Sequence, residues 1–198
     1  MLEVRALSRP GLAPVDLDLA EGEALALLGP SGSGKTLLLR AIADLDPNEG
    51  RVSLDGMSRE AVSGPEWRSR VTYLAAEPGW WAARPAEHFA DPAAARAFLA
   101  PLGLPEDSLD RPITELSTGE RHRLALIRVL VQSPKVLLLD EPSAGLDQDT
   151  ARALENVLRE RIKNGAAILF STHDEALAAR LGDRRLRVSG GRVAEETS

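Results

Sequence analysis

The segment from Gly29 to Thr36 has the residue types and spacing of a phosphate-binding loop. Its members are Gly29, Pro30, Ser31, Gly32, Ser33, Gly34, Lys35 and Thr36. Glycines allow the backbone to turn tightly, so that successive N–H groups converge on a β-phosphate at the positive end of the following helix. In such a loop the lysine bridges the β- and γ-phosphates and the threonine hydroxyl ligates Mg²⁺. The segment therefore predicts binding of a nucleoside triphosphate with magnesium.

Two carboxylates, Asp140 and Glu141, directly follow the apolar run 136–139. A buried strand that ends in such a pair directs both acids toward the phosphates. We expect Asp140 to hold Mg²⁺, directly or through water, and Glu141 to orient and polarise the attacking water. A plain surface turn after a core strand is the alternative, but a phosphate loop itself requires such a carboxylate.

A third polar segment, Ser117-Thr118-Gly119-Glu120, lies between these two motifs. Ser117 and Glu120 are spaced as a capping box, so taken alone the segment indicates only the start of a helix. The segment also offers a hydroxyl, a glycine that permits close approach, and a helix N-terminus that favours an anion. Both interpretations stay open on the residues alone.

The elements that must position these groups alternate between strands and helices. Strands are expected near 2–7, 14–19, 24–29, 52–54, 71–75, 136–139 and 167–170, and longer helices near 118–132 and 148–163. The first strands form an N-terminal antiparallel β-layer, and a hairpin is expected around Gly190 and Gly191. Alternation of strands and helices predicts an α/β fold with a mostly parallel sheet, which binds ligands at the carboxyl ends of its strands.

The composition changes between residues 78 and 115, where alanine, proline and charged residues predominate. Asp91 followed by Pro92 is placed like a helix N-cap followed by a first-turn proline. We therefore predict an inserted helical subdomain over about 78–115 and a core made of about 1–77 and 116–198.

The bulk composition narrows the classes of function. The chain has 198 residues, no cysteine, 43% hydrophobic residues and a formal net charge of −6. This composition excludes disulfides and thiolate catalysis, and the absence of a basic run argues against a nucleic-acid partner. No uninterrupted apolar run of about 18 residues occurs, so we expect a cytoplasmic chain that reaches a membrane only through a separate partner.

The ordered motifs resemble those of the ATP-binding cassette (ABC) ATPases, whose signature is Leu-Ser-Gly-Gly-Gln. In this chain Thr118 and Glu120 stand at the third and fifth signature positions. The segment 143–147, which ends in Asp147, looks like the D-loop of that family, and 171–174 looks like its switch region with His173. The resemblance covers the chain from about residue 2 to 193 and implies the P-loop NTPase core of the ABC ATPase fold.

The resemblance implies a head-to-tail dimer, either a homodimer or a paired cassette, that encloses two MgATP molecules. The signature residues Ser117, Thr118, Gly119 and Glu120, together with Asp147, would then bind nucleotide. Lys35, Glu141 and His173 would be the catalytic residues, with His173 on the γ-phosphate. Family members usually drive a separate integral membrane permease from the cytoplasmic face, and the helical subdomain forms the contact.

The chain departs from the family at three places. The usual glutamine after the strand near Val71 is replaced by Ala76, and the adjacent Glu77 either ligates Mg²⁺ or is kept away by its charge. No aromatic residue precedes Trp67, so Pro10, Leu12 or nothing takes the place of the usual adenine platform. The helical subdomain is also short for the family.

Adjacent tryptophans, Trp80 and Trp81, follow on an expected loop. They either pack in the core of the subdomain or form a hydrophobic anchor for the permease.

The sequence therefore predicts an ATPase, the nucleotide-binding subunit of an ABC transporter. A soluble ABC ATPase that acts on a macromolecular assembly, such as one in cofactor biogenesis, is the alternative. A catalytically silent ATP-binding subunit is favoured only by Ala76 and the missing aromatic. The cargo and the direction of transport are properties of the partner, not of this chain.

Overall fold

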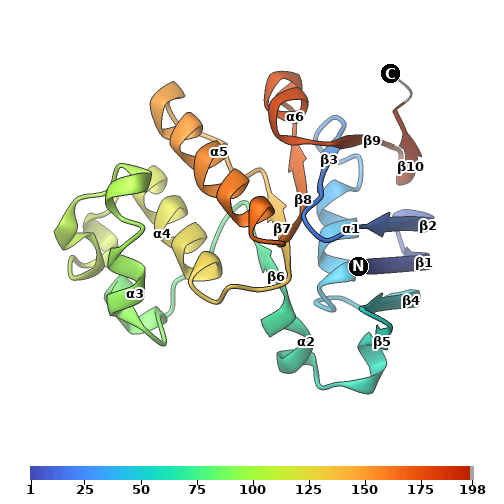
Figure 1. Cartoon of the computed structure of the whole chain (residues 1–198), viewed down its shortest axis with the longest axis horizontal. Coiled ribbons are helices and arrows are strands. Elements are labelled where there is room, and N and C mark those ends of the chain that lie inside the picture. The colour runs from blue at the N-terminus through green and yellow to red at the C-terminus, as the bar shows by residue number, and fades with distance from the viewer. Residues whose placement is uncertain (197–198) are drawn as a thin grey trace.

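The computed structural model describes residues 1–196, so positions 197 and 198 of the expected core lie outside the described residues. Two sheets form the body of the molecule (Figure 1). A four-stranded antiparallel sheet has the order β2-β1-β4-β5 and supplies the expected N-terminal layer. Its strands are β1 (Leu2–Arg9), β2 (Leu12–Leu19), β4 (Glu49–Leu54) and β5 (Met57–Ser58).

A six-stranded sheet with the order β10-β9-β3-β8-β7-β6 carries the predicted motifs. All its pairings are parallel except that of β10 with β9. Its strands are β3 (Ala24–Leu28), β6 (Val71–Leu74), β7 (Val136–Asp140), β8 (Ala167–Thr172), β9 (Arg184–Ser189) and β10 (Arg192–Glu195). The predicted α/β fold with a mostly parallel sheet is thus confirmed.

Helices cover this parallel sheet on both faces. The α-helices are α1 (Lys35–Ile42), α2 (Gly64–Arg70), α3 (Pro92–Arg96), α4 (Thr118–Leu130), α5 (Gln148–Lys163) and α6 (Glu175–Leu181). Successive residues of β3 alternate between two cores. Leu25 and Leu27 pack with α1 and the antiparallel sheet, whereas Ala24, Ala26 and Leu28 pack with α4, α5 and α6. Helix α1 is therefore held between the two sheets, which fixes the loop that precedes it.

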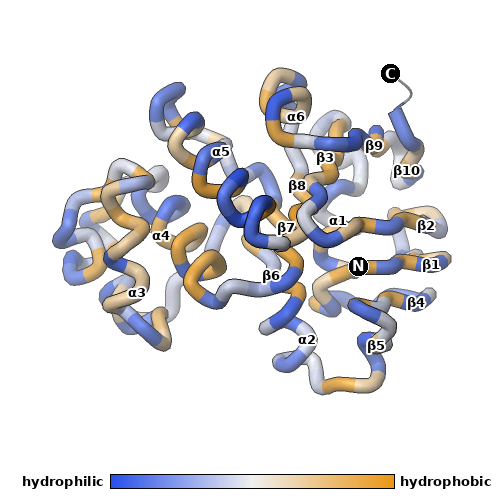
Figure 2. The backbone as a smooth tube through the Cα atoms, in the orientation of Figure 1, coloured by the Kyte–Doolittle hydropathy of each residue, from blue (hydrophilic) through white to orange (hydrophobic). Residues whose placement is uncertain are grey.

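The three central strands β3, β7 and β8 are buried along their whole length. Figure 2 shows hydrophobic residues on these strands and hydrophilic residues over the outer turns of α5. Near-continuous apolar strands are expected when both faces of a parallel sheet are covered. The polar residues that follow the carboxyl ends of these parallel strands consequently lie close together on one side of the sheet.

The predicted helical subdomain, residues 78–115, contains one α-helix, α3, and its extent as a subdomain stays a prediction. Short 3₁₀ helices lie at Pro85–His88, Ala100–Leu102, Glu106–Leu109 and Ile113–Glu115, joined by irregular segments. Asp91 caps α3, since its Oδ1 accepts a hydrogen bond of 3.0 Å from the Ala94 N–H. The segment lies beside α4, on the far side of the molecule from the antiparallel sheet (Figure 1).

Candidate functional site

The phosphate-binding loop connects β3 to α1, as the sequence predicts. Gly29 has a φ of 148°, and a Cβ there would lie 2.2 Å from the carbonyl oxygen of Val188, so a side chain cannot be accommodated. Lys35, which is only 7% exposed, donates hydrogen bonds from Nζ to the carbonyl oxygens of Gly29 at 2.7 Å and Pro30 at 3.2 Å. The ammonium group therefore lies over the loop that precedes it.

The C-terminal hairpin holds this loop from outside. The Gly191 N–H donates to the carbonyl oxygen of Ser33 at 2.9 Å, and the Gly191 carbonyl accepts from the Ala13 N–H at 2.8 Å. The turn between β9 and β10 thus connects the phosphate-binding loop to β2. These backbone bonds fix the loop without using any side chain that faces the expected ligand.

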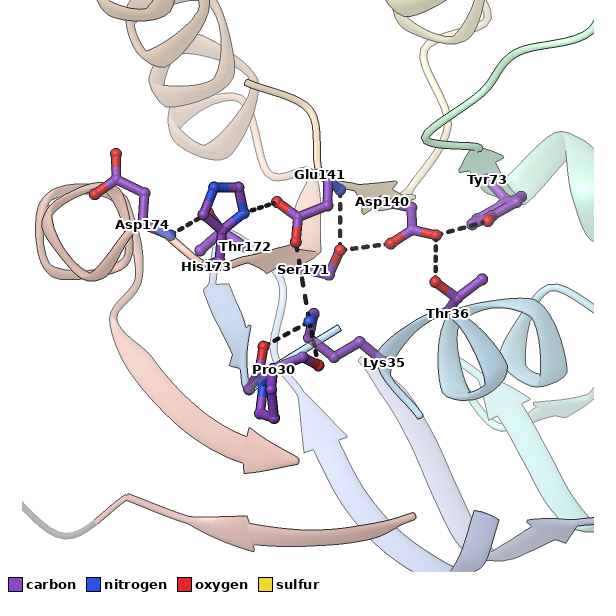
Figure 3. A network of polar contacts seen from close by, with 11 residues as sticks. Pro30, Lys35, Thr36, Tyr73, Asp140, Glu141, Ser171, Thr172, His173 and Asp174 are labelled. Atoms are coloured by element: carbon purple, nitrogen blue, oxygen red, sulfur yellow. Dashed lines mark hydrogen bonds and ion pairs between the residues drawn. The ribbon is translucent and has the colours of Figure 1, made fainter. Parts of the chain in front are cut away.

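Asp140 is the centre of a polar network at the carboxyl ends of the strands (Figure 3). It is 3% exposed and accepts three side-chain hydrogen bonds. Thr36 Oγ1 and Tyr73 Oη donate to Oδ2 at 2.7 Å and 3.1 Å, and Ser171 Oγ donates to Oδ1 at 2.6 Å. A buried carboxylate needs such donors, because desolvation without them would be costly.

The phenol of Tyr73 is an unexpected member of this network. Burial and the neighbouring Asp140 carboxylate both raise the pKa of Tyr73 well above its usual range. The hydroxyl therefore keeps its proton and remains a donor to Asp140. Tyr73 faces Leu138 in the register of β6 and β7, so its ring reaches along β7 to the strand end.

Glu141 adopts a left-handed conformation, with a φ of 48°. Such a backbone costs a non-glycine residue about 1–3 kcal/mol and is characteristic of functional sites. The Glu141 N–H donates to Ser171 Oγ at 2.9 Å, which holds the turn. The carboxylate then lies between two predicted catalytic groups, with Oε2 at 3.0 Å from His173 Nδ1 and Oε1 at 3.9 Å from Lys35 Nζ (Figure 3). The His173 side chain is 75% exposed.

The residues present fit a magnesium nucleotide. Thr36 and Asp140 bring a hydroxyl and a carboxylate oxygen together within 2.7 Å beside the phosphate-binding loop. This oxygen-only donor set is typical of Mg²⁺, which takes one or two carboxylates and completes its shell with phosphates and water. No group of three or more His, Cys, Asp or Glu side chains among residues 1–196 could hold a metal ion by itself. Phosphate oxygens are consequently needed to complete the site.

The predicted signature segment starts α4 and lies apart from this network. Ser117 Oγ accepts from the Glu120 N–H at 3.2 Å and Glu120 Oε2 accepts from the Ser117 N–H at 2.8 Å, which forms the capping box. Arg111 lies 3.2 Å from Glu120, and these contacts lower the pKa of Glu120. Ser117 and Thr118 are exposed, while Gly119 is half-buried. The start of this helix is thus capped by its own side chains.

The other predicted ligands are also outside the network. Asp147 caps α5, where its two carboxylate oxygens accept from the N–H and the hydroxyl of Thr150 at 2.9 Å and 2.7 Å. Glu77 is exposed, and within residues 1–196 its side chain makes no hydrogen bond or ion pair with the Asp140 network. Leu12 is 4% exposed within the core, so of the two residues considered for the adenine platform only Pro10 is exposed.

The two adjacent tryptophans have different environments. Trp80 packs against the core of the helical side, whereas Trp81 is 76% exposed. The Arg128 guanidinium stacks on both rings, at 4.8 Å from Trp80 and 5.0 Å from Trp81. The His88 ring meets both of them edge-on. Trp80 therefore packs as the first interpretation expects, while an anchor role for Trp81 stays a prediction.

Sequence reasoning missed Tyr73 and did not connect Ser171 with Asp140. Ser171 lies in the predicted switch segment, but its hydroxyl bonds β7 to β8 and does not face outward. The signal for Tyr73 was a hydroxyl-bearing aromatic residue in a strand whose other members are Val71, Thr72 and Leu74. That signal would have been informative only with the strand register known.

The comparisons with known proteins agree with this geometry. The family model described as "ABC transporter" matches residues 12–144, from the first β-layer through the Asp140–Glu141 pair. This match covers more than half of the chain. The chain belongs to the ABC transporter family and is an ATP-binding cassette.

Curated relatives match nearly the whole chain. The Fe(3+) ions import ATP-binding protein FbpC of Streptomyces avermitilis is 37% identical over 205 residues, which cover 97% of this chain but only 59% of that relative. The hemin import ATP-binding protein HmuV of Streptomyces coelicolor is 37% identical over 212 residues, which cover 98% of this chain and 74% of the relative. The lipoprotein-releasing system ATP-binding protein LolD 1 of Caulobacter vibrioides is 35% identical over 207 residues, which cover 92% of this chain and 86% of the relative.

Solved structures share the fold. One described as the ATP-binding subunit of an ABC transporter superimposes with a TM-score of 0.87 at 29% identity. The match covers all of this chain and 90% of the chain in that structure. A dimeric ATP-binding cassette with ADP and Pi bound, in a post-hydrolysis state, gives a TM-score of 0.84 at 24% identity and supports the fold alone. Within residues 1–196, no helix is both long and apolar enough to cross a membrane.

Proposed function

We propose that this chain is the ATP-hydrolysing subunit of an ABC transporter and that it powers a separate membrane permease. The observation that carries this proposal is the position of Glu141 between Lys35 and His173, next to the buried Asp140. A phosphate loop alone would support binding. The additional carboxylate at the strand end supports hydrolysis.

In this mechanism ATP reacts with water to give ADP and phosphate. Lys35 and the loop N–H groups neutralise the transferring phosphoryl group, which carries most of the charge in the transition state. Glu141 orients the attacking water and accepts a hydrogen bond from it. His173 contacts the γ-phosphate, and its 3.0 Å contact with Glu141 connects the two groups.

Thr36 and Asp140 would hold Mg²⁺, which supplies charge neutralisation across the β- and γ-phosphates when bound. Asp140 is already fixed by its buried bond to Ser171, so its carboxylate needs little reorganisation to accept an ion. Glu77 is exposed on the segment after β6, and we leave it outside this site.

Two cassettes would assemble head to tail, as a homodimer or a pair with another cassette. The exposed start of α4 supports this arrangement, because Ser117 and Thr118 face outward at a helix N-terminus. The signature segment of one subunit, with Gly119 and Glu120, would then close the nucleotide site of the other. The same reasoning assigns Asp147 to the interface.

The permease would lie against residues 78–115, the part of the chain that we propose as the helical subdomain. Trp81 supports this placement, since a largely exposed tryptophan on a cationic neighbour is typical of interface anchors. The subunit would accordingly be peripheral on the cytoplasmic face of the membrane. The relatives serve iron, hemin and lipoprotein systems, so the proposal names the coupling and not a cargo.

The substitution Glu141→Gln tests this function. It keeps the shape of the side chain and removes the charge that positions water, so we expect hydrolysis to fall by about 100-fold or more while MgATP still binds. With ATP and Mg²⁺ present, light scattering should then report a stable dimer. Glu49→Gln, an exposed carboxylate on β4, is the matched control and should behave like the wild type. A wild-type protein that binds MgATP without hydrolysing it would contradict the proposal.

A further inference from the structure

Strand β6 is an edge of the parallel sheet and pairs only with β7. The segment that follows it, residues 75–81, leads directly to the two tryptophans. Ala76 and Glu77 are exposed, and within the described residues neither side chain forms a hydrogen bond with the Asp140 network. Tyr73 is thus the residue of β6 whose side chain reaches that network, through its 3.1 Å bond to Asp140.

The two oxygens of Asp140 are held differently. Oδ1 is held by Ser171 alone, while Oδ2 accepts from both Thr36 and Tyr73. Thr36 is the expected magnesium ligand, and a hydroxyl that ligates a cation turns its lone pair toward the ion. The hydroxyl keeps its proton when it ligates an ion, so Tyr73 would be the second donor, beside Thr36, that orients Oδ2. Hydrogen bonds to ligating carboxylates of this kind tune metal affinity.

The geometry agrees with this role, because the phenol donates from β6 to Asp140 Oδ2 at 3.1 Å. A neutral donor holds Asp140 without cancelling the negative charge that a cation needs. Phenylalanine would preserve the ring and its packing but not the hydrogen bond. The hydroxyl can therefore be tested separately from the aromatic ring.

We propose that Tyr73 is a positioning residue: it orients Asp140 for magnesium and connects nucleotide occupancy to the 75–81 segment. The proposal rests on the proposed function of the site and adds to it. A change at Asp140 is transmitted through the phenol to β6, and β6 continues into the loop that carries Trp80 and Trp81. The hydroxyl thereby couples the site to the surface proposed for the permease.

The test compares ADP binding with Mg²⁺ and with EDTA, by calorimetry, in three forms of the full chain. In Tyr73→Phe we expect the affinity gained from Mg²⁺ to fall roughly 10-fold to 100-fold, as for loss of one hydrogen bond to a metal-ligating carboxylate, while affinity in EDTA is unchanged. Thr72→Val is the matched control. It removes a neighbouring hydroxyl of the same strand, which donates to the Arg68 carbonyl oxygen at 2.9 Å and not to Asp140.

Tryptophan fluorescence gives a second readout that a purely structural role would not move. Addition of MgADP should change the emission of the wild type and of Thr72→Val, and this change should be lost in Tyr73→Phe. Equal magnesium dependence and equal emission changes in all three forms would overturn the proposal, as would equal losses in both variants. If the wild type fails to bind MgADP, the proposed function itself is overturned and this inference with it.

Discussion

Two regions of this molecule handle buried charge in opposite ways. At the strand ends, the buried carboxylate of Asp140 has three hydroxyl donors. On α4, the half-buried guanidinium of Arg128 has no ion-pair partner among residues 1–196. It donates to the Gly79 carbonyl oxygen at 3.3 Å, and its charge lies over the faces of Trp80 and Trp81. Burial alone lowers the pKa of Arg128.

The difference shows in which region the buried polar groups have all their partners within the chain and in which region they do not. A network whose polar atoms are satisfied is rigid, and it suits chemistry that needs fixed positions. A cation held by aromatic faces, next to a tryptophan that is 76% exposed, keeps binding capacity for a further molecule. The first region therefore suits the hydrolysis proposed above, and the second suits the proposed contact with a partner. Three substitutions test this comparison.

The largest expected effect comes from Lys35→Ala, which removes the cation of the first region. Lys35 is buried and contacts both the loop and Glu141, and among residues 1–196 no other lysine or arginine forms an ion pair with Glu141. We expect ATP binding to weaken by about 100-fold, since the lost bonds are charge-assisted. Calorimetry measures this change, and Lys163→Ala, at an exposed lysine of α5, is the control. Unchanged affinity would contradict the assignment of the loop.

Much of the fold and of the candidate site could be predicted because the residues that form each motif are close together in sequence. The loop 29–36, the pair Asp140 and Glu141, and the capping box at Ser117 each depend on local spacing, which the chain itself shows. The helix boundaries at Asp91 and Asp147 follow from N-cap preferences for the same reason.

What could not be predicted depends on contacts between distant strands. Tyr73 meets Asp140 only because β6 pairs with β7 in one register, and a shift by one residue would turn the phenol away. Trp80 and Trp81 are neighbours in sequence, yet Trp80 packs on the core whereas Trp81 is largely exposed, and Arg128 from another element stacks on both. Spacing alone contains neither fact.

A smaller effect is expected from Trp81→Ala, which alters the second region. Because Trp81 is largely exposed, the free energy of unfolding should change by only about 0.5 kcal/mol, and ATP hydrolysis by the isolated chain should be preserved. Sedimentation of the chain with membranes from its own host should decrease. Trp80→Ala is the matched comparison and should destabilise the fold more, because Trp80 packs on the core. Membrane association that equals the wild type would contradict an anchor at Trp81.

The smallest effect concerns His88, whose ring meets both tryptophans. Burial and the nearby Arg128 charge lower the pKa of His88, although the Glu87 charge opposes them. The His88 Nε2 accepts a 3.1 Å hydrogen bond from the Ala82 N–H. The folded chain therefore binds this proton less readily than the unfolded chain. The contribution to stability is complete above the unfolded pKa of about 6.5 and decreases as the pH falls from there toward the lower folded pKa.

His88→Gln should flatten this part of the pH dependence. Urea unfolding between pH 7.5 and pH 5 measures the free energy of unfolding of both forms, and the difference between them isolates His88. His122 is also buried with a lowered pKa, but it contributes equally to the wild type and the variant. Protonation should also change tryptophan emission in the wild type and not in the variant, since the new charge adjoins Trp80, Trp81 and Arg128. If the stability of the wild type and of His88→Gln changed with pH in parallel, neither burial nor the Arg128 charge would lower the pKa of His88. The second region would then balance its charge as the first one does.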